Sequence, residues 1–385
     1  MASKEETQRE IAEEKTAVPR REPKNPKGEY NFDTGIKVPK EYGSPAPDIA
    51  GQYRKELIQA QPYLNMEEGQ CLYKTERKQK TTLDKVKGSV LGFAIGDALG
   101  SPGEFSKNPH YLSGFESSPR KGLQAGQYTD DTQHLEVGLD SLIVYNGKIN
   151  FQDHADRLIR WYKSGGARSI GRTTELAIKN LMEGVDYSKS GINHINYCGS
   201  SAIARLVPYS LLSAVSRYPH KLFRSDIKKI LGITHAHRKV LAMGELYNYL
   251  IQEVANGKTP GEAINMLLFE DVFLNRRVRD KIKKVKDLSE SSESPGETIQ
   301  KIGDSGFVED VIFSSIYGAL KGSSFKEAVL ISANGGGDSD SRAALTGTLC
   351  GLDIGASQIP VDLRTQLERN SELEKKAEEI YFLRK

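Results

Sequence analysis

Two aspartates and a serine follow a run of three glycines in the stretch NGGGDSDS, residues 334–341. Glycine permits positive φ and close backbone approach, so this turn can direct the carboxylates of Asp338 and Asp340 and the hydroxyl of Ser341 toward one point. The alternative is that these residues cap the helix predicted to follow. A cap needs one acceptor, whereas the stretch offers three. We therefore expect the stretch to bind a ligand, with a metal ion as the first candidate.

A second acidic stretch, YTDDT at residues 128–132, also precedes an apolar helical pattern. Asp130 and Asp131 are adjacent and flanked by threonines, and the spacing from Asp130 to Gln133 resembles a capping box. Neighbouring carboxylates at the start of a buried helix repel each other and need a counter-charge. No lysine or arginine within the motif supplies it.

The third stretch is GSVLGFAIGDALGSPGEF, residues 88–105. Helical spacing places Asp97 on the same face as Val86, Val90 and Phe93, so its carboxylate is predicted to point into the core. Such a group is costly unless it is paired or bound to a metal. A hydrogen-bonded core carboxylate and a metal ligand remain equal alternatives for Asp97. Glu104 follows after a break in the helix.

Together, the three stretches offer hard oxygen donors without cysteine, which favours Mg²⁺ or Mn²⁺ over Zn²⁺ or copper. Five or more carboxylates exceed the need of one divalent ion, so we expect two ions that lie about 3.5 to 4 Å apart. An EF-hand is excluded because Arg342 and Ala343 occupy the positions where that loop needs an acidic or amide residue and a glycine. The Gly-Lys-Ser/Thr of a phosphate-binding loop is absent.

From about Thr82 onward, apolar residues recur at helical spacing and alternation with period two is scarce. This pattern predicts an all-α domain of roughly ten or more helices with functional groups on the connecting loops. Ser289–Glu297 is predicted to be an exposed loop. The predicted helical runs are Phe151–Lys163, Arg172–Met182, Ser200–Val215, Lys239–Val254, Pro260–Phe269, Val308–Leu320, Phe325–Ser332 and Asp340–Gly351.

Composition excludes several classes of protein. No apolar run approaches the roughly 20 residues of a membrane span, and the charged N-terminus does not resemble a signal peptide. Cys71, Cys198 and Cys350 lack the spacing of a disulfide framework or a zinc site, so a cytoplasmic location is expected. The net charge of +3 gives no reason to expect nucleic acid. The basic run Asn275–Lys286 is interpreted as a solvated helix face.

Residues 1–80 differ from the rest of the chain, because they are rich in Lys, Glu, Pro, Gly and Gln and have little apolar material to bury. We expect an extended, mobile N-terminal arm that precedes a domain spanning residues 81–385. Spaced aromatic residues such as Tyr30, Phe32 and Tyr42 are possible anchors for a partner. A floppy tail, or a lid over the protein's own cleft, are the alternatives.

Six ordered motifs resemble the ADP-ribosylglycohydrolases, in particular those of the dinitrogenase reductase activating type. They are GDALGSPGE (96–104), YTDDT (128–132), SIGRTT (169–174), ITH (233–235), GFVEDV (306–311) and GGDSDS (336–341). The resemblance covers Lys85 to about Leu367 and implies an all-α orthogonal helical bundle with a dinuclear centre of two Mg²⁺ or Mn²⁺ ions. A metal-activated water would attack the anomeric carbon of the ribose.

The resemblance also implies the residues of the site. The metal ligands would be Glu104, Thr129, Asp130, Asp131, Asp338, Asp340 and Ser341. Either Asp131 or Glu104 would act as the catalytic acid or base. Arg168, Ser169 and Gly171 would bind the diphosphate and His235 would contact the substrate, although the loop of residues 164–171 could be an ordinary turn and His235 a core histidine.

Two departures from the family pattern concern these sites. Ser339 and Ser341 replace the usual threonines of the last motif, but Ser341 keeps a ligating hydroxyl. In YCGSSAIARLVP, residues 197–208, Arg205 and Pro208 match the family, whereas its asparagine and methionine are missing. We therefore expect metal binding to be retained and the nucleotide pocket to differ.

The implied function is removal of ADP-ribose from modified protein side chains, with arginine-linked ADP-ribose as the expected substrate. The arm resembles those of hydrolase-type immunity proteins that protect bacteria against ADP-ribosyltransferase toxins. It predicts that residues 1–80 bind and block such a toxin while the domain reverses the modification. The alternative function is that of a non-catalytic toxin-binding or ADP-ribose-binding protein on the same fold. Neither nucleic acid nor a membrane is an expected partner.

Overall fold

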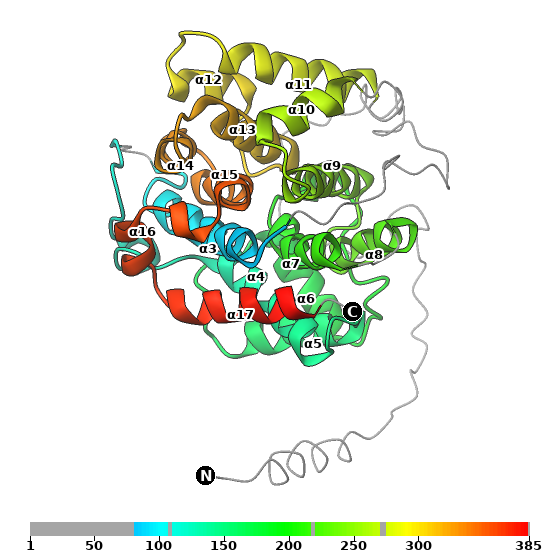
Figure 1. The fold of residues 1–385 in the computed structure, drawn as a ribbon. Coiled ribbons are helices and arrows are strands. Elements are labelled where there is room, and N and C mark those ends of the chain that lie inside the picture. Colours follow the sequence, from blue (N-terminus) through cyan, green and yellow to red (C-terminus); the bar gives the residue numbers. More distant parts are fainter. Residues whose placement is uncertain (1–80, 107–109, 217–219, 270–274, 384–385) are drawn as a thin grey trace. The chain divides into compact units, whose positions relative to one another are not determined.

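Helices joined by short loops form the fold of the computed structural model, which describes residues 81–106, 110–216, 220–269 and 275–383 (Figure 1). No strand occurs among these residues, where β-structure is limited to isolated bridges. The α-helices are α3 (Leu83–Gly100), α4 (Asp130–Val144), α5 (Phe151–Lys163), α6 (Arg172–Met182), α7 (Ala202–Val215), α8 (His220–Gly232), α9 (Arg238–Ala255), α10 (Pro260–Phe269), α11 (Arg276–Ser289), α12 (Pro295–Ile302), α13 (Val308–Lys321), α14 (Phe325–Ala333), α15 (Ser339–Ile354), α16 (Val361–Gln366) and α17 (Asn370–Phe382). Short 3-10 turns are η2 (Pro119–Lys121), η3 (Ile195–Tyr197) and η4 (Ala356–Gln358). The predicted all-α fold is confirmed.

Most predicted helical runs agree with these bounds. The bounds of α5, α6 and α10 coincide with the predicted ones, because local signals such as the Asn150 cap on Asp153 mark them. One prediction needs a correction. Ser289–Glu297 is not a continuous loop, since α11 extends to Ser289 and α12 begins at Pro295, where proline suits a first helical turn.

The centre of the domain is the antiparallel pair α3 and α15, which lie side by side (Figure 1). Glycines recur every four residues along one face of α3 and meet the small residues of α15. A methyl group on Gly92 would lie 2.1 Å from the carbonyl oxygen of Gly347, and one on Gly88 would lie 2.2 Å from that of Gly351. The two backbones are therefore in direct contact. The C-terminal end of α3 thereby meets the N-terminal end of α15, where the acidic motifs stand.

The remaining helices cover this pair. α13 and α14 pack against α15, and α11 and α12 lie outside them against α13 (Figure 1). On the other side, α17 packs against α3 and α4, while α7 lies between α4 and α9. α5 packs against α4, and α6 against α5. The start of α4 and the start of α15 therefore lie at the same end of the central pair, next to the C-terminal end of α3.

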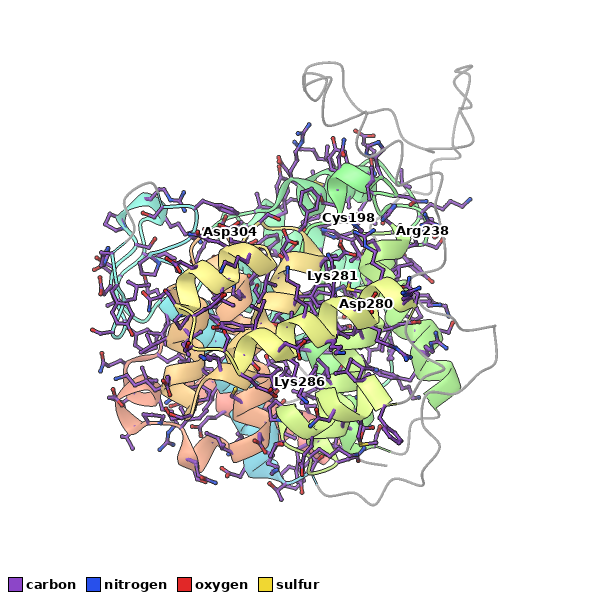
Figure 2. All side chains as sticks on the ribbon, turned by 90° about the horizontal axis from the view of Figure 1, so that it is seen from above. Cys198, Arg238, Asp280, Lys281, Lys286 and Asp304 are labelled. Atoms are coloured by element: carbon purple, nitrogen blue, oxygen red, sulfur yellow. The ribbon has the colours of Figure 1, made fainter. Side chains whose placement is uncertain are left out.

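Helix α11 contains most of the basic run that was predicted to be a solvated face. It crosses the face of the domain seen in Figure 2, where Asp280, Lys281 and Lys286 are labelled along it. Val278, Ile282 and Val285 form its buried side, and Asp280 is exposed. The spacing is that of an amphipathic surface helix, as predicted.

Three further predictions concern the chain as a whole. Of the three cysteines, Cys198 and Cys350 are free and buried, and Cys71 lies outside the described residues. Across the described part of the chain, no helix combines the length and apolar character that a membrane span requires. The predicted arm, residues 1–80, lies outside the described residues.

Candidate metal centre

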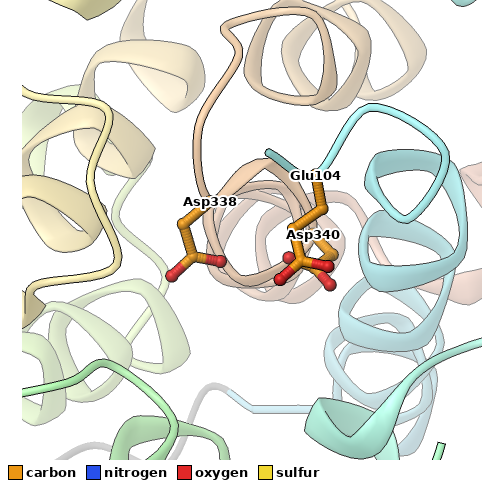
Figure 3. A group of neighbouring side chains, drawn as sticks. All are labelled: Glu104, Asp338 and Asp340. Atoms are coloured by element: carbon orange, nitrogen blue, oxygen red, sulfur yellow. The ribbon is translucent and has the colours of Figure 1, made fainter. Parts of the chain in front are cut away.

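Three carboxylates converge where α3 ends and α15 begins. Glu104, Asp338 and Asp340 each place one oxygen within 4.8 Å of the others (Figure 3). The turn before α15 makes this possible, because Gly337 has a φ of 55° and a methyl group there would lie 1.8 Å from the carbonyl oxygen of Asp304. Only glycine fits this position. The amide of Phe105 donates to the carbonyl of Gly337 at 2.8 Å, which ties Glu104 to the turn.

Asp338 occupies the N-cap position of α15 but makes no capping hydrogen bond through its side chain. Its Oδ2 instead accepts a hydrogen bond from the hydroxyl of Ser200 at 3.0 Å. The capping alternative therefore does not account for Asp338. Ser200 belongs to this site; it lies in the stretch of residues 197–208 that was compared with the family pattern, but it was not singled out there.

Asp130 and Asp131 form the first turn of α4 and face α15. Thr129 is the N-cap, and its Oγ1 accepts from the amide of Asp131 at 3.3 Å. The interpretation of Asp130 and Gln133 as a capping box is therefore wrong, since Gln133 binds Gly166 and Trp161 instead. The Ser341 hydroxyl donates to Oδ2 of Asp131 at 2.6 Å. This bond joins the two acidic motifs, which lie 210 residues apart in sequence.

Asp97 is fully buried and holds the start of α4. It accepts hydrogen bonds from the amide of Thr129 at 2.9 Å, the amide of Thr132 at 2.9 Å and the hydroxyl of Thr132 at 2.6 Å. Of the two interpretations left open by the sequence, the core carboxylate is the one observed. Its effect on the site is indirect, because these bonds fix where Asp130 and Asp131 begin their helix.

The acidic side chains line a cavity of about 340 Å³. Six predicted metal ligands line it, namely Glu104, Asp130, Asp131, Asp338, Asp340 and Ser341, and Thr129 does not. Ser169, Gly171 and His235 also line the cavity, as expected for substrate-binding residues. Arg168 does not line it. Its guanidinium donates to Glu368 and to the carbonyl of Tyr128 at 2.8 Å.

His235 reaches the cavity from a buried polar network. Arg205 is fully buried and donates to the hydroxyl of Thr234, which bonds Nδ1 of His235 at 2.9 Å. Nε2 of His235 is buried and has no hydrogen-bond partner within the described residues. Burial and the Arg205 charge keep the pKa of His235 well below its usual value, so the ring is neutral. The network therefore fixes the orientation of the His235 ring beside the cavity.

A counter-charge comes from outside the motifs. Lys121, in the turn η2, places its ammonium against Glu104 and at 2.7 Å from Oδ2 of Asp340. Sequence reasoning correctly found no cation within the YTDDT motif but missed Lys121, since it stands in a stretch without helical periodicity or motif. The ammonium is held where negative charge is densest.

Burial and repulsion between neighbouring carboxylates raise the pKa values of most acidic groups in the site. Burial and the charge of Asp340 raise the pKa of Glu104 to about 7, and the same two causes raise the pKa of Asp130 to about 7. Burial raises the pKa of Asp131 and of Asp338 well above the usual range, with neighbouring aspartates adding to it. Burial is the largest single influence on Asp340 and opposes its ionisation, but the charge of Lys121 and the hydrogen bonds from Asp338, Lys121 and the Ser341 amide together lower its pKa. Further positive charge would stabilise this site.

The donor set fits a hard divalent cation. The converging atoms are carboxylate and hydroxyl oxygens, the ligands that Mg²⁺ and Mn²⁺ prefer, and no cysteine of the described residues lines the cavity. The ammonium of Lys121 shows that a cation is accommodated between two of the carboxylates. A cluster of acidic residues that could bind a metal ion, Glu104, Asp338 and Asp340, is therefore present.

Comparison with known proteins identifies the family. A sequence model of the ADP-ribosylglycohydrolase family matches residues 78–385. An uncharacterized protein of Archaeoglobus fulgidus is 30% identical over 78% of this chain and 97% of its own length. ADP-ribosylarginine hydrolase Tri1 of Serratia proteamaculans is 26% identical over 79% of this chain and 81% of its own. The ADP-ribosyl-[dinitrogen reductase] glycohydrolase of Rhodospirillum rubrum is 27% identical over 76% and 92%, respectively.

A solved structure supports the fold independently. A chain of an ADP-ribosylglycohydrolase-related protein complex aligns with a TM-score of 0.65 and 24% identity over 78% of this chain and 98% of that chain. The fold, the acidic centre and the sequence matches agree, and the prediction of a glycohydrolase is confirmed. The chain belongs to the ADP-ribosylglycohydrolase family.

Proposed function

We propose that this glycohydrolase removes ADP-ribose from arginine side chains of modified proteins with the help of two divalent cations. The observation that carries the proposal is the convergence of Glu104, Asp338 and Asp340 with Asp130 and Asp131 at one end of a 340 Å³ cavity. The relatives named ADP-ribosylarginine hydrolase support the arginine linkage.

The residues that would hold the cations come from three segments, namely the turn after α3, the start of α4 and the start of α15. Glu104, Asp338 and Asp340 would hold one ion, while Asp130, Asp131 and Ser341 offer donors for a second. The hydroxyl of Thr129 accepts a hydrogen bond from the amide of Asp131 and does not line the cavity, so we assign Thr129 to neither ion. When bound, Mg²⁺ or Mn²⁺ supplies Lewis acidity toward the ribose hydroxyls and toward water.

Proton transfer falls to a carboxylate on the cavity wall. Glu104 lines the cavity and is one candidate for this role. Asp131 is the other candidate, and its Oδ2 is oriented by the Ser341 hydroxyl. The geometry supports both as acid and base candidates.

The rest of the substrate would lie along the start of α6. Ser169 and Gly171 line the cavity directly before this helix, whose N-terminus has no side-chain cap and offers a positive dipole end to a diphosphate. The neutral ring of His235 lines the same cavity. Arg168 has no part in this proposal, because Glu368 already binds its guanidinium.

Hydrolysis of matched substrates tests the proposal. Full-length protein with Mg²⁺ is incubated with arginine-, serine- and acid-linked ADP-ribosyl peptides, and released ADP-ribose is measured by mass spectrometry. We expect release from the arginine-linked peptide, and loss of at least a hundredfold in rate for Asp338→Ala and Asp130→Ala. Asp287→Asn, an exposed position on α11, serves as the control and should retain full activity. Full activity of Asp338→Ala would reject the metal-centre assignment.

We also propose a more specific role in immunity against a toxin. This role depends on residues 1–80, which lie outside the described residues. Deletion of residues 1–70 should abolish binding of an ADP-ribosyltransferase toxin and leave hydrolysis unchanged. Toxin affinity that survives the deletion would reject binding by the arm. The alternative, a non-catalytic binder, would show ADP-ribose binding without release in the hydrolysis experiment.

A further inference from the structure

The ammonium of Lys121 lies where a divalent cation would bind. It contacts Glu104 and Asp340, two of the three residues of the carboxylate cluster, and its side chain is only 7% exposed. We propose that Lys121 is an internal counter-cation, which competes with a divalent metal for these two carboxylates and must leave them when the metal binds. The inference rests on the proposed metal site and adds a residue that none of the family motifs contains.

Competition follows from shared carboxylate groups. The bond from Lys121 to Asp340 is a 2.7 Å contact with Oδ2, and the contact with Glu104 uses Oε2. These carboxylates also belong to the cluster that could surround a metal. An ammonium in hydrogen-bonding contact with both would stand next to a doubly charged ion, and the two charges would repel at close range inside a buried site. One cation therefore excludes the other from this position.

The local structure allows Lys121 to leave while the turn stays in place. Ser118 and Leu123 pair through two backbone hydrogen bonds, at 2.8 and 3.1 Å, and close the turn around η2. The Ser118 hydroxyl also binds the carbonyl of Ser101 at 3.2 Å. These bonds hold the backbone, whereas the lysine reaches the site through a flexible four-carbon stem. Rotation of that stem alone can withdraw the ammonium.

Arg120 provides a matched comparison next to Lys121. Its guanidinium contacts the backbone carbonyl of Glu104, and its side chain is 56% exposed. Its distance to Oε2 of Glu104 is 3.5 Å. It carries the same charge close to the same carboxylate, yet it does not bridge two members of the cluster. If nearby positive charge in general weakened metal binding, both residues would weaken it. If Lys121 competes directly with the metal, only Lys121 would weaken it.

Metal binding without substrate is the first test. Mg²⁺ and Mn²⁺ are titrated into the full-length protein by calorimetry for the natural sequence, Lys121→Met and Arg120→Met. We expect Lys121→Met to bind metal at least tenfold more tightly, and Arg120→Met to change the affinity less than threefold. Unchanged or weaker binding by Lys121→Met would overturn the inference, as would an equal gain in Arg120→Met. Absence of metal binding in all three proteins would instead reject the metal site itself.

Thermal unfolding separates competition from a purely structural role. In chelator, Lys121→Met should melt below the natural protein, because it leaves Glu104 and Asp340 without a counter-charge. In saturating Mg²⁺ this difference should disappear or reverse. An equal difference with and without metal would overturn the inference.

Lys121→Arg covers the case in which Lys121→Met does not fold. Its guanidinium keeps the charge and can bind both carboxylates, so we expect metal affinity equal to or below that of the natural protein. Tighter metal binding by Lys121→Arg would contradict the competition.

Discussion

Gly96 of α3 and Ala343 of α15 bring two helices into backbone contact, since a methyl group on Gly96 would lie 2.1 Å from the carbonyl oxygen of Ala343. The next glycine along α3, Gly100, is as close to Ser339 and Asp340. The separation of the helices therefore determines where the first turn of α15 stands relative to Glu104. The same contacts that stabilise the core place the carboxylates.

The substitution Gly96→Ala should be strongly destabilising for this reason. Backbone atoms of Ala343 and Ala344 surround the position and cannot move as a flexible side chain could, so we expect a loss of about 3 kcal/mol or more in the free energy of unfolding. Urea unfolding measures it. Gly114→Ala is the control, because nothing lies within 4 Å of its Cβ position, and its effect should stay within about 0.5 kcal/mol. Equal stability of the two variants would contradict the backbone contact.

The substitution Asp97→Asn should weaken both stability and hydrolysis. The carboxylate accepts three hydrogen bonds from Thr129 and Thr132, and an asparagine amide would face donors with a donor. We expect the free energy of unfolding to fall by about 2 to 3 kcal/mol. We also expect hydrolysis to fall at least tenfold, although Asp97 does not line the cavity. Retention of both properties would show that Asp97 does not position α4.

The acidic site could be predicted because each motif contains its own signal. Asp338 and Asp340 follow a run of glycines, which indicates a tight turn. Asp130 and Asp131 begin an apolar helix. Helix ends were predictable where caps and prolines mark them, as at Asn150 and Pro260.

Other features could not be predicted because they depend on contacts distant in sequence. Lys121 binds Asp340 across 219 residues, and Arg168 binds Glu368 across 200. The sequence around Lys121 or Arg168 does not indicate which carboxylate the side chain binds. The glycine face of α3 was also missed, since helical periodicity was judged from apolar side chains and glycine has none. Three-dimensional packing decides these contacts.

Arg168 and Glu368 should behave as a pair of structural residues. The guanidinium donates to both carboxylate oxygens of Glu368, and both side chains are about four-fifths buried. In a double-mutant cycle of Arg168→Met and Glu368→Gln, we expect a coupling energy of about 1 to 2 kcal/mol in urea unfolding. The Michaelis constant for ADP-ribosyl substrate should rise equally in both single variants. A rise confined to Arg168→Met would instead support direct contact with the diphosphate.

Buried neutral histidines should make the protein sensitive to acid. His134 and His154 are fully buried, and burial first, then the charge of Arg205, holds the pKa of each well below the usual value of 6.5. As pH falls below about 6.5, the unfolded chain binds protons that the folded state excludes, so the free energy of unfolding decreases by about 1.4 kcal/mol per pH unit for each histidine. The buried carboxylates with raised pKa values act in the opposite direction, and a comparison of variants cancels their effect. Between pH 6 and 5, urea unfolding of His134→Asn should show a slope smaller by about one proton than that of the natural protein. Equal slopes would show that His134 takes up a proton in the folded state.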